Sequence, residues 1–221
     1  MVDGAVPIKA PRVDPLYLPG TDLGPAQLLA DSAPLTGTLG QAYSEHRHVP
    51  VIIAEQAGVR FYPDFAGRPA VIVPLYDCDN QLVSIHGRYL HTVRGQNKML
   101  TIGLGNGLIS VLGGGPAEPI IVVEGLFDAL SLATCGWSAL ATIGRWATWL
   151  PDRCVGREVW LGFDASKGAE AEATRYQGAL SGAKVRRVRP PGRSKDWNSA
   201  LRKHGVAALQ YWLKHHLTAA G

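Results

Sequence analysis

Hydrophobic residues in the second half of the chain fall into short runs, and a stretch with helical spacing follows each run. Short apolar runs bounded by turn signals are typical of strands buried on both faces of a parallel sheet. The predicted order is strand 120–123, helix 126–135, strand 138–142, helix 146–150, strand 158–163, helix 168–181, strand 184–189 and helices 195–204 and 205–217. This alternation predicts an α/β fold with a mainly parallel sheet, flanking helices and right-handed crossovers.

The first half of the chain has a different pattern. The apolar segments 71–76 and 82–90 flank Asp77–Asn80, whose composition is typical of a turn, so an antiparallel strand pair is expected. One or two short helices are predicted within residues 25–48, and another over 51–57. This part therefore predicts a smaller α+β arrangement.

Proline and glycine divide the sequence into three parts. Proline recurs through residues 1–25, which predicts a flexible N-terminal arm. The Gly-rich segment 113–119 is expected to separate the α+β subdomain, residues 26–115, from the sheet domain with its C-terminal helices, residues 116–221. The 221 residues suffice for one large domain or two small ones.

Composition excludes several classes of protein. The chain is 46% hydrophobic and 18% charged, as globular proteins are, and it has neither an apolar run long enough for a membrane span nor the N-terminal pattern of a signal peptide. A cytoplasmic protein without a membrane partner is expected. Cys78, Cys135 and Cys154 form no Cys-x-x-Cys pair, so the sequence indicates neither a zinc ribbon nor a disulfide framework.

Basic residues are concentrated in the last quarter of the chain, although the net charge is only +4. They are Arg175, Lys184, Arg186, Arg187, Arg189, Arg193, Lys195, Arg202 and Lys203. A basic stripe of this kind suits a polyanion held by its backbone, and a solvated basic face is the alternative interpretation.

Acidic residues stand at the ends of two predicted strands. Glu124 follows the run Ile120–Val123, and Asp164 follows Val159–Phe163. Because ligands bind at the carboxyl ends of parallel strands, these two carboxylates are expected to lie close enough to share a divalent cation. Asp128 would face the same place from the first turn of the following helix, unless it serves only as a helix-start acid. The pattern therefore predicts a metal site for phosphate chemistry.

These acids belong to a set of motifs that resembles the Toprim domain of bacterial and phage DNA primases. The resemblance lies in Glu124-Gly125-x-x-Asp128, Phe163-Asp164-Ala-Ser166-Lys-Gly168 and Lys195-Asp196-Trp-Asn198-Ser199. Upstream, four segments follow the order of the basic subdomain that precedes Toprim in primases: Pro34–Thr38, Ala42–Arg47, Gly87–Leu90 and Lys98–Leu100. It spans about residues 33–205. It implies a Toprim Rossmann-like domain preceded by that basic subdomain.

The resemblance also implies an activity, namely metal-dependent, template-directed synthesis of primers from nucleoside triphosphates on single-stranded DNA. Glu124, Asp164 and Asp128 would be catalytic, and Glu124, Asp164 and Asp196 would bind Mg²⁺ or Mn²⁺. In two-metal transfer, one ion activates the attacking hydroxyl and the other neutralises the leaving pyrophosphate. The residues implied to hold nucleotide or nucleic acid are Arg88, Lys98, Lys195, Gly125 and Arg47.

The sequence departs from the family pattern at two acids. Ser166 replaces the second acid of an Asp-x-Asp motif, and Ser199 stands where many relatives have aspartate. A hydroxyl is a weaker metal ligand than a carboxylate, so one metal position could be lost or filled through water. Glu170 or Glu172 could compensate, although both are interpreted first as surface helix acids. Asp196 could also act as a helix N-cap.

Three functions therefore remain open. The first is a phage- or mobile-element-type primase that depends on a replicative helicase or a zinc-binding module elsewhere, since the chain has no Gly-x-x-x-x-Gly-Lys loop. The second is a Toprim nuclease, which uses the same site to hydrolyse DNA. The third is a catalytically weakened nucleic-acid-binding module. A topoisomerase is not expected, because that activity needs a nucleophilic tyrosine in a second large domain.

Overall fold

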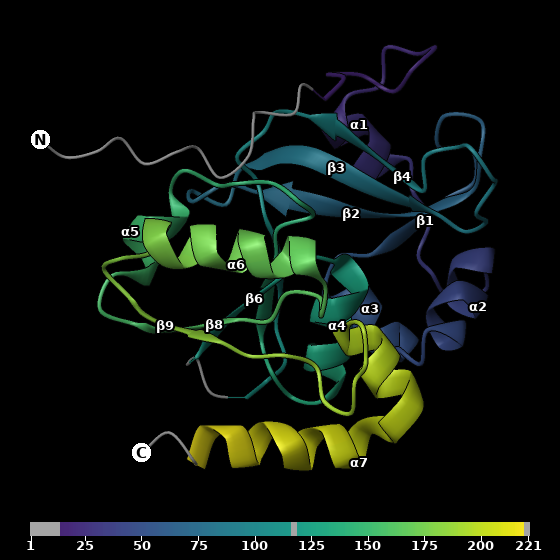
Figure 1. Cartoon of the computed structure of the whole chain (residues 1–221). Helices are drawn as coiled ribbons and strands as arrows, with labels where there is room; N and C mark the ends of the chain where they lie inside the picture. Colours follow the sequence, from purple (N-terminus) through teal and green to yellow (C-terminus); the bar gives the residue numbers. More distant parts are fainter. Residues whose placement is uncertain (1–13, 116–118, 219–221) are drawn as a thin grey trace, which may run out of the picture. The chain divides into compact units, whose positions relative to one another are not determined.

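The computed structural model describes residues 14–115 and 119–218 (Figure 1). The chain divides into two compact units. Residues 12–110 form the N-terminal unit, and residues 111–221 belong to the C-terminal unit.

The N-terminal unit is built on an antiparallel sheet with the strand order β1-β2-β3-β4. Its strands are β1 (Arg60–Tyr62), β2 (Ala70–Tyr76), β3 (Leu82–Tyr89) and β4 (Met99–Gly103). The predicted antiparallel pair is confirmed as β2 and β3. Their turn is held by Asp77, whose Oδ1 accepts hydrogen bonds from the backbone N–H groups of Asp79 and Gln81, both at 2.9 Å. Strands β1 and β4 were not predicted, because β1 has only three residues and Met99–Gly103 does not alternate strictly between apolar and polar residues.

Three short helices accompany this sheet: α1 (Pro25–Ala30), α2 (Leu39–His46) and α3 (Val51–Gln56). The core lies between α1 and the sheet, where Leu28, Phe65, Ile72 and Ile85 are fully buried. Gly87 is required on β3, because a Cβ at this position would overlap the Phe65 ring. Helix α1 thus closes one face of the sheet.

The predicted N-terminal arm is only partly described. Residues 1–13 lie outside the described residues. Leu18 is only 3% exposed and belongs to the core cluster, and the backbone N–H of Gly103 donates to Pro15 O at 2.8 Å. Leu18 and the Pro15 carbonyl are therefore held by the N-terminal unit, whereas Leu16 and Tyr17 are 52% and 56% exposed, and the flexibility of the arm stays a prediction.

The C-terminal unit is built on a five-stranded sheet with the order β5-β7-β6-β8-β9, of whose first strand only the last residue, Val111, lies within the unit itself. Its strands are β5 (Ile109–Val111), β6 (Ile120–Val123), β7 (Ala139–Ala141), β8 (Glu158–Leu161) and β9 (Lys184–Arg187). Strand β6 pairs in parallel with β7 and β8, and β8 pairs in parallel with β9. The mainly parallel sheet is therefore confirmed. Its β-branched central strand, β6, is almost wholly buried, as expected for a strand covered on both faces.

Four helices belong to this unit: α4 (Leu126–Thr134), α5 (Leu150–Cys154), α6 (Lys167–Ala179) and α7 (Trp197–Thr218). The predicted helix over 146–150 is wrong in position, because Pro151 favours a helix that begins beside it. The two predicted C-terminal helices are confirmed as the two parts of α7, which the kink at the non-helical Gly205, with φ 78°, divides (Figure 1).

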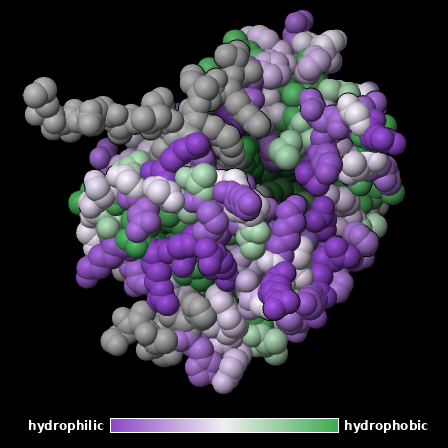
Figure 2. Space-filling model, viewed as in Figure 1, coloured by the Kyte–Doolittle hydropathy of each residue, from purple (hydrophilic) through white to green (hydrophobic). Residues whose placement is uncertain are grey.

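Packing in the C-terminal unit relies on large aromatic residues. Trp160, Phe163, Tyr176 and Trp197 are each at most 1% exposed. In the view of Figure 2, hydrophilic side chains cover most of the described surface. Among the described residues, no helix combines the length and the apolar character that crossing a bilayer requires.

Candidate metal centre

Three aspartates from distant parts of the sequence meet in the C-terminal unit. Asp128, Asp164 and Asp196, called the acidic trio below, each offer a carboxylate oxygen, and these oxygens all lie within 4.8 Å of one another. Asp128 is in the first turn of α4, Asp164 follows β8, and Asp196 directly precedes α7. The sheet topology explains the meeting, because the carboxyl ends of neighbouring parallel strands share one edge.

The main chain around Asp128 is fitted closely to its side chain. Gly125 caps α4, and a Cβ at this position would lie 2.7 Å from Asp128 Oδ2. The backbone N–H of Asn198 donates to Asp128 Oδ1 at 3.1 Å, and Asn198 Nδ2 donates to Ser131 Oγ at 3.0 Å. Glycine at 125 therefore leaves room for the carboxylate, and the start of α7 orients it.

The segments that carry Asp164 and Asp196 are joined directly. The backbone N–H of Ala165 donates to Lys195 O at 2.7 Å, and the Trp197 indole donates to Gly162 O at 2.7 Å. Asp196 Oδ1 accepts the backbone N–H of Ser199 at 2.7 Å, so this residue also caps α7, as the sequence allowed. These bonds fix the spacing between the two carboxylates.

Burial and mutual repulsion both disfavour the ionised forms of these acids. Burial, followed by the charges of Asp196 and Asp164, raises the pKa of Asp128 to about 8. Burial and the charge of Asp196 also raise the pKa of Asp164, against the opposing effect of Lys195 and Arg187. Carboxylates crowded in this way are stabilised by a bound cation, which would remove the repulsion.

A pH dependence follows from the raised pKa of Asp128. At pH 6 this carboxyl is protonated and must release a proton to bind a cation, so Mn²⁺ affinity is expected to rise by about 10-fold per pH unit up to about pH 8. Between about pH 4 and 8, and without the ion, Asp128 is protonated in the folded state but ionised in the unfolded chain. The free energy of unfolding should therefore fall as the pH rises through this range. Calorimetry in buffers of different ionisation enthalpy would measure the released proton, and a pH-independent affinity would contradict the assignment.

Glu124 lies at the end of β6, as predicted, but it is not a member of the acidic trio. Its carbonyl oxygen accepts the backbone N–H of Ile143 at 2.8 Å. Ile143, with φ 47°, begins a turn that continues through Gly144 to the buried Arg145. Such strain in a β-branched residue often marks functional sites. Sequence analysis missed this turn, although Gly144 after a predicted strand was a signal for it.

The two serines that stand where the family pattern has acids both contribute hydrogen bonds at helix starts. Ser166 Oγ accepts the backbone N–H of Ala169 at 3.1 Å and caps α6. Ser199 donates its backbone N–H to Asp196. Of the two acids that could compensate, Glu170 pairs with Arg187 and Arg189, and Glu172 pairs with Arg175 at 3.0 Å. Both glutamates are thus engaged by arginines, and neither is a member of the trio.

The basic residues predicted to bind nucleotide or nucleic acid lie mostly in the N-terminal unit. Arg88 lies on β3, where it pairs with Met99, and Lys98 is exposed just before β4. Arg47 ends α2 and donates to the Tyr43 hydroxyl at 3.0 Å. Lys195, in the C-terminal unit, is exposed beside Asp196. Lys195 is therefore adjacent in sequence to a member of the trio, and the roles of all four residues stay predictions.

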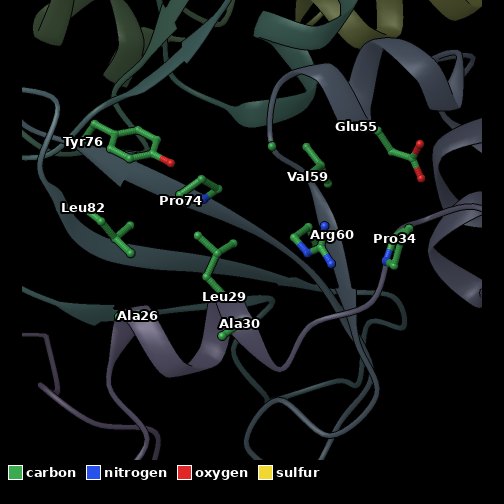
Figure 3. A pocket seen from close by; sticks show the side chains of 11 residues that line it. Ala26, Leu29, Ala30, Pro34, Glu55, Val59, Arg60, Pro74, Tyr76 and Leu82 are labelled. Carbon is green, nitrogen blue, oxygen red and sulfur yellow. The ribbon is translucent and has the colours of Figure 1, made fainter.

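The N-terminal unit also has an open pocket of about 760 Å³ (Figure 3). Its lining is mainly apolar and consists of Ala26, Leu29, Ala30, Pro34, Glu55, Gly58, Val59, Arg60, Pro74, Tyr76 and Leu82. Glu55 accepts the backbone N–H of Thr36 at 2.9 Å, and Arg60 donates to Ser32 Oγ at 2.6 Å. Because both charged groups bind within the fold, the pocket is an apolar recess rather than an ionic site.

Comparison with known proteins gives a result at the level of structure. No family model and no curated protein matches the sequence. The zinc-binding and RNA polymerase domains of the Aquifex aeolicus primase match with a TM-score of 0.65 and 15% identity, over 86% of this chain and 59% of that chain. This chain thus spans less than two thirds of that structure.

Two further solved structures match in the same way. The DnaG primase catalytic domain bound to ssDNA matches with a TM-score of 0.61 and 19% identity, over 82% of this chain and 76% of that one. The primase fragment of the bacteriophage T7 primase-helicase protein matches with a TM-score of 0.56 and 18% identity, over 76% and 72%. The chain therefore has the fold of bacterial and phage primase catalytic cores, which confirms the resemblance at the level of fold.

Proposed function

We propose that this chain is a DNA primase core that uses Mg²⁺ or Mn²⁺ to join nucleotides on a single-stranded DNA template. The observation that carries the proposal is the acidic trio at the carboxyl edge of a parallel sheet, in a fold shared with primase catalytic domains. One such domain was solved with ssDNA bound, which supports the choice of template.

The donor set suits a hard divalent cation. Carboxylate oxygens are the ligands that Mg²⁺ and Mn²⁺ prefer, and three of them within 4.8 Å of one another can hold one ion. When bound, the ion neutralises charge on the transferred phosphoryl group. Lys195 would hold a phosphate oxygen beside Asp196. Gly125, which has no side chain, would let a phosphate of the substrate approach the main chain next to Asp128. Glu124 would accept the proton of the attacking hydroxyl.

Template and nucleotide would also need contacts from the N-terminal unit. Arg88, Lys98 and Arg47 are proposed for this part, since guanidinium and ammonium groups bind phosphate. A zinc-binding module or a helicase would be supplied by another region or chain, as the descriptions of two structural neighbours suggest. Salt-dependent binding of single-stranded DNA is the expected property of this basic set.

The proposal is tested by incubating the chain with single-stranded DNA, labelled ribonucleoside or deoxynucleoside triphosphates and Mn²⁺. Synthesis of labelled oligonucleotides that does not occur when EDTA is present from the start would support it. Metal-dependent loss of DNA without nucleotides would instead indicate the nuclease. DNA binding that ignores metal, with no product, would indicate the catalytically weakened binding module.

The capping role of Ser166 gives a prediction on ion number. Wild-type protein is expected to bind one Mn²⁺, because Ser166 serves α6 and the trio offers one group of carboxylates. Ser166→Asp, which restores the Asp-x-Asp pattern and keeps an N-cap, should add a second ion of weaker affinity. Titration calorimetry measures the stoichiometry. The control is Ser181→Asp, which adds the same charge at an exposed position; Ser138 is half-buried and would not serve. Two ions in the wild type would contradict the prediction.

A further inference from the structure

Arg187 belongs to the basic stripe that the sequence offered for binding a polyanion. It ends β9, whose neighbour β8 leads to Asp164, and its side chain is 17% exposed. A guanidinium group has five N–H donors in a fixed plane. How these donors are used decides whether Arg187 can bind a substrate.

All five donors of Arg187 are used within the fold. Nη1 donates to Leu161 O at 2.9 Å and to Val188 O at 2.8 Å. Nη2 donates to Asp164 O at 2.8 Å and to Glu170 Oε1 at 2.7 Å, and Nε donates to the same carboxylate oxygen at 3.2 Å. No N–H of this group is left for a phosphate, so a direct substrate contact is excluded in this state.

The acceptors come from three elements around the loop that holds Asp164. Leu161 ends β8, Val188 follows β9, and Glu170 lies in the first turn of α6. One rigid group therefore fixes both ends of the segment between β8 and α6. Since Asp164 O is itself an acceptor, the main chain that sets the direction of this carboxylate is tied to the guanidinium.

Arg189 provides a contrast two residues further on. It also binds Glu170, through Nε at 3.0 Å and Nη2 at 2.9 Å, but its side chain is 63% exposed. No described bond joins it to the main chain near Asp164. The two arginines together lower the pKa of Glu170 to about 2, so the anchor stays ionised across the physiological range.

We propose that Arg187, anchored by Glu170, is a positioning residue that presents the Asp164 carboxylate to the bound cation where the second acid of the motif is absent. In a chain with Asp-x-Asp, two carboxylates would hold the ion from this loop. Here Ser166 is committed to the cap of α6, so the loop offers one carboxylate and its orientation decides affinity. The inference rests on the proposed metal-dependent function.

The test is Mn²⁺ titration calorimetry of the full chain in the wild type, Arg187→Lys, Glu170→Gln and the control Arg189→Gln. Lysine keeps the charge but has three donors on a single nitrogen, so it cannot replace the five N–H bonds of the planar guanidinium. Arg187→Lys is expected to raise the Mn²⁺ dissociation constant by about 10-fold, the lower end of what losing such a supporting contact costs. Glu170→Gln should raise it by a smaller factor, because the Gln Oε1 can still accept a hydrogen bond from Arg187, and Arg189→Gln should leave it unchanged within the error.

Kinetics separate positioning from a general loss of structure. At saturating Mn²⁺, Arg187→Lys should regain the wild-type kcat, with KM for nucleotide unchanged, because only ion affinity was lowered. A rate that excess Mn²⁺ does not restore would reduce Arg187 to a structural residue and overturn the inference. Should Arg187→Lys fail to fold, Glu170→Gln carries the same test with the smaller shift.

The outcomes also distinguish this inference from the proposed function. If Asp164→Asn loses Mn²⁺ while both Arg187→Lys and Glu170→Gln bind it as the wild type does, the inference alone is overturned. If the wild type binds no Mn²⁺, the proposed function fails and the inference fails with it.

Discussion

Replacing Asp164 with asparagine is expected to abolish primer synthesis and to weaken Mn²⁺ binding by at least about 100-fold, because changes to residues that merely support a ligand already cost about 10- to 100-fold. Asp164 is one of three carboxylates that can hold the cation, and asparagine keeps its shape while removing the charge. The fold should survive, since the substitution also relieves repulsion with Asp196. Calorimetry and a primer assay measure the two effects.

A matched control for this variant is Asp79→Asn. Asp79 is exposed in the β2–β3 turn, where its backbone rather than its carboxylate contributes to the described hydrogen bonds. Its substitution should leave both readouts unchanged. If Asp164→Asn bound Mn²⁺ as tightly as the wild type, the acidic trio would not be the metal site, whatever the chain's activity.

Replacing Trp197 with alanine is expected to lower the free energy of unfolding by about 3–5 kcal/mol, the usual cost of removing a large buried aromatic side chain. Trp197 is 1% exposed, packs against Trp212 and donates its indole N–H to Gly162 O. The substitution removes both the packing and the bond that holds α7 to the end of β8. Equilibrium denaturation in urea would measure the change.

Two further variants separate the contributions at this position. Trp197→Phe keeps most of the volume but leaves Gly162 O without this donor, so about 1–3 kcal/mol should be lost. Tyr211→Ala, at a residue that is 67% exposed on the same helix, should change stability by less than about 0.5 kcal/mol. Equal losses in Trp197→Ala and Tyr211→Ala would refute the assigned role of Trp197.

Much of the C-terminal unit could be predicted because its central strand is a continuous apolar run and the strands alternate with stretches of helical spacing. The four β-branched residues Ile120–Val123 predict a buried strand, and the acid-glycine pair that follows marks the strand end. The parallel order then implies that the segments after β6 and β8 meet. The meeting of Asp128 and Asp164 was therefore accessible to sequence reasoning, even though their catalytic roles remain predictions.

Other features depend on contacts that no local pattern encodes. Strands β1 and β5 have three residues each, too few to display a period. The partners of Arg187 are 17 and 23 residues away in sequence for Glu170 and Asp164, and the basic cluster in which it lies suggested a solvated or substrate-binding face instead. The side-chain hydrogen bonds of the folded structure show that this guanidinium reaches backbone carbonyls.

The wide spacing of the acidic trio has a consequence for folding kinetics. Its members are separated by 36 residues, from 128 to 164, and by 32 residues, from 164 to 196. During folding, contacts between distant segments form late, because closing the long loop between them first costs conformational entropy. A cation that needs all three carboxylates would find no binding site in the early chain. The bound cation would therefore lower the unfolding rate of the C-terminal unit without raising its folding rate.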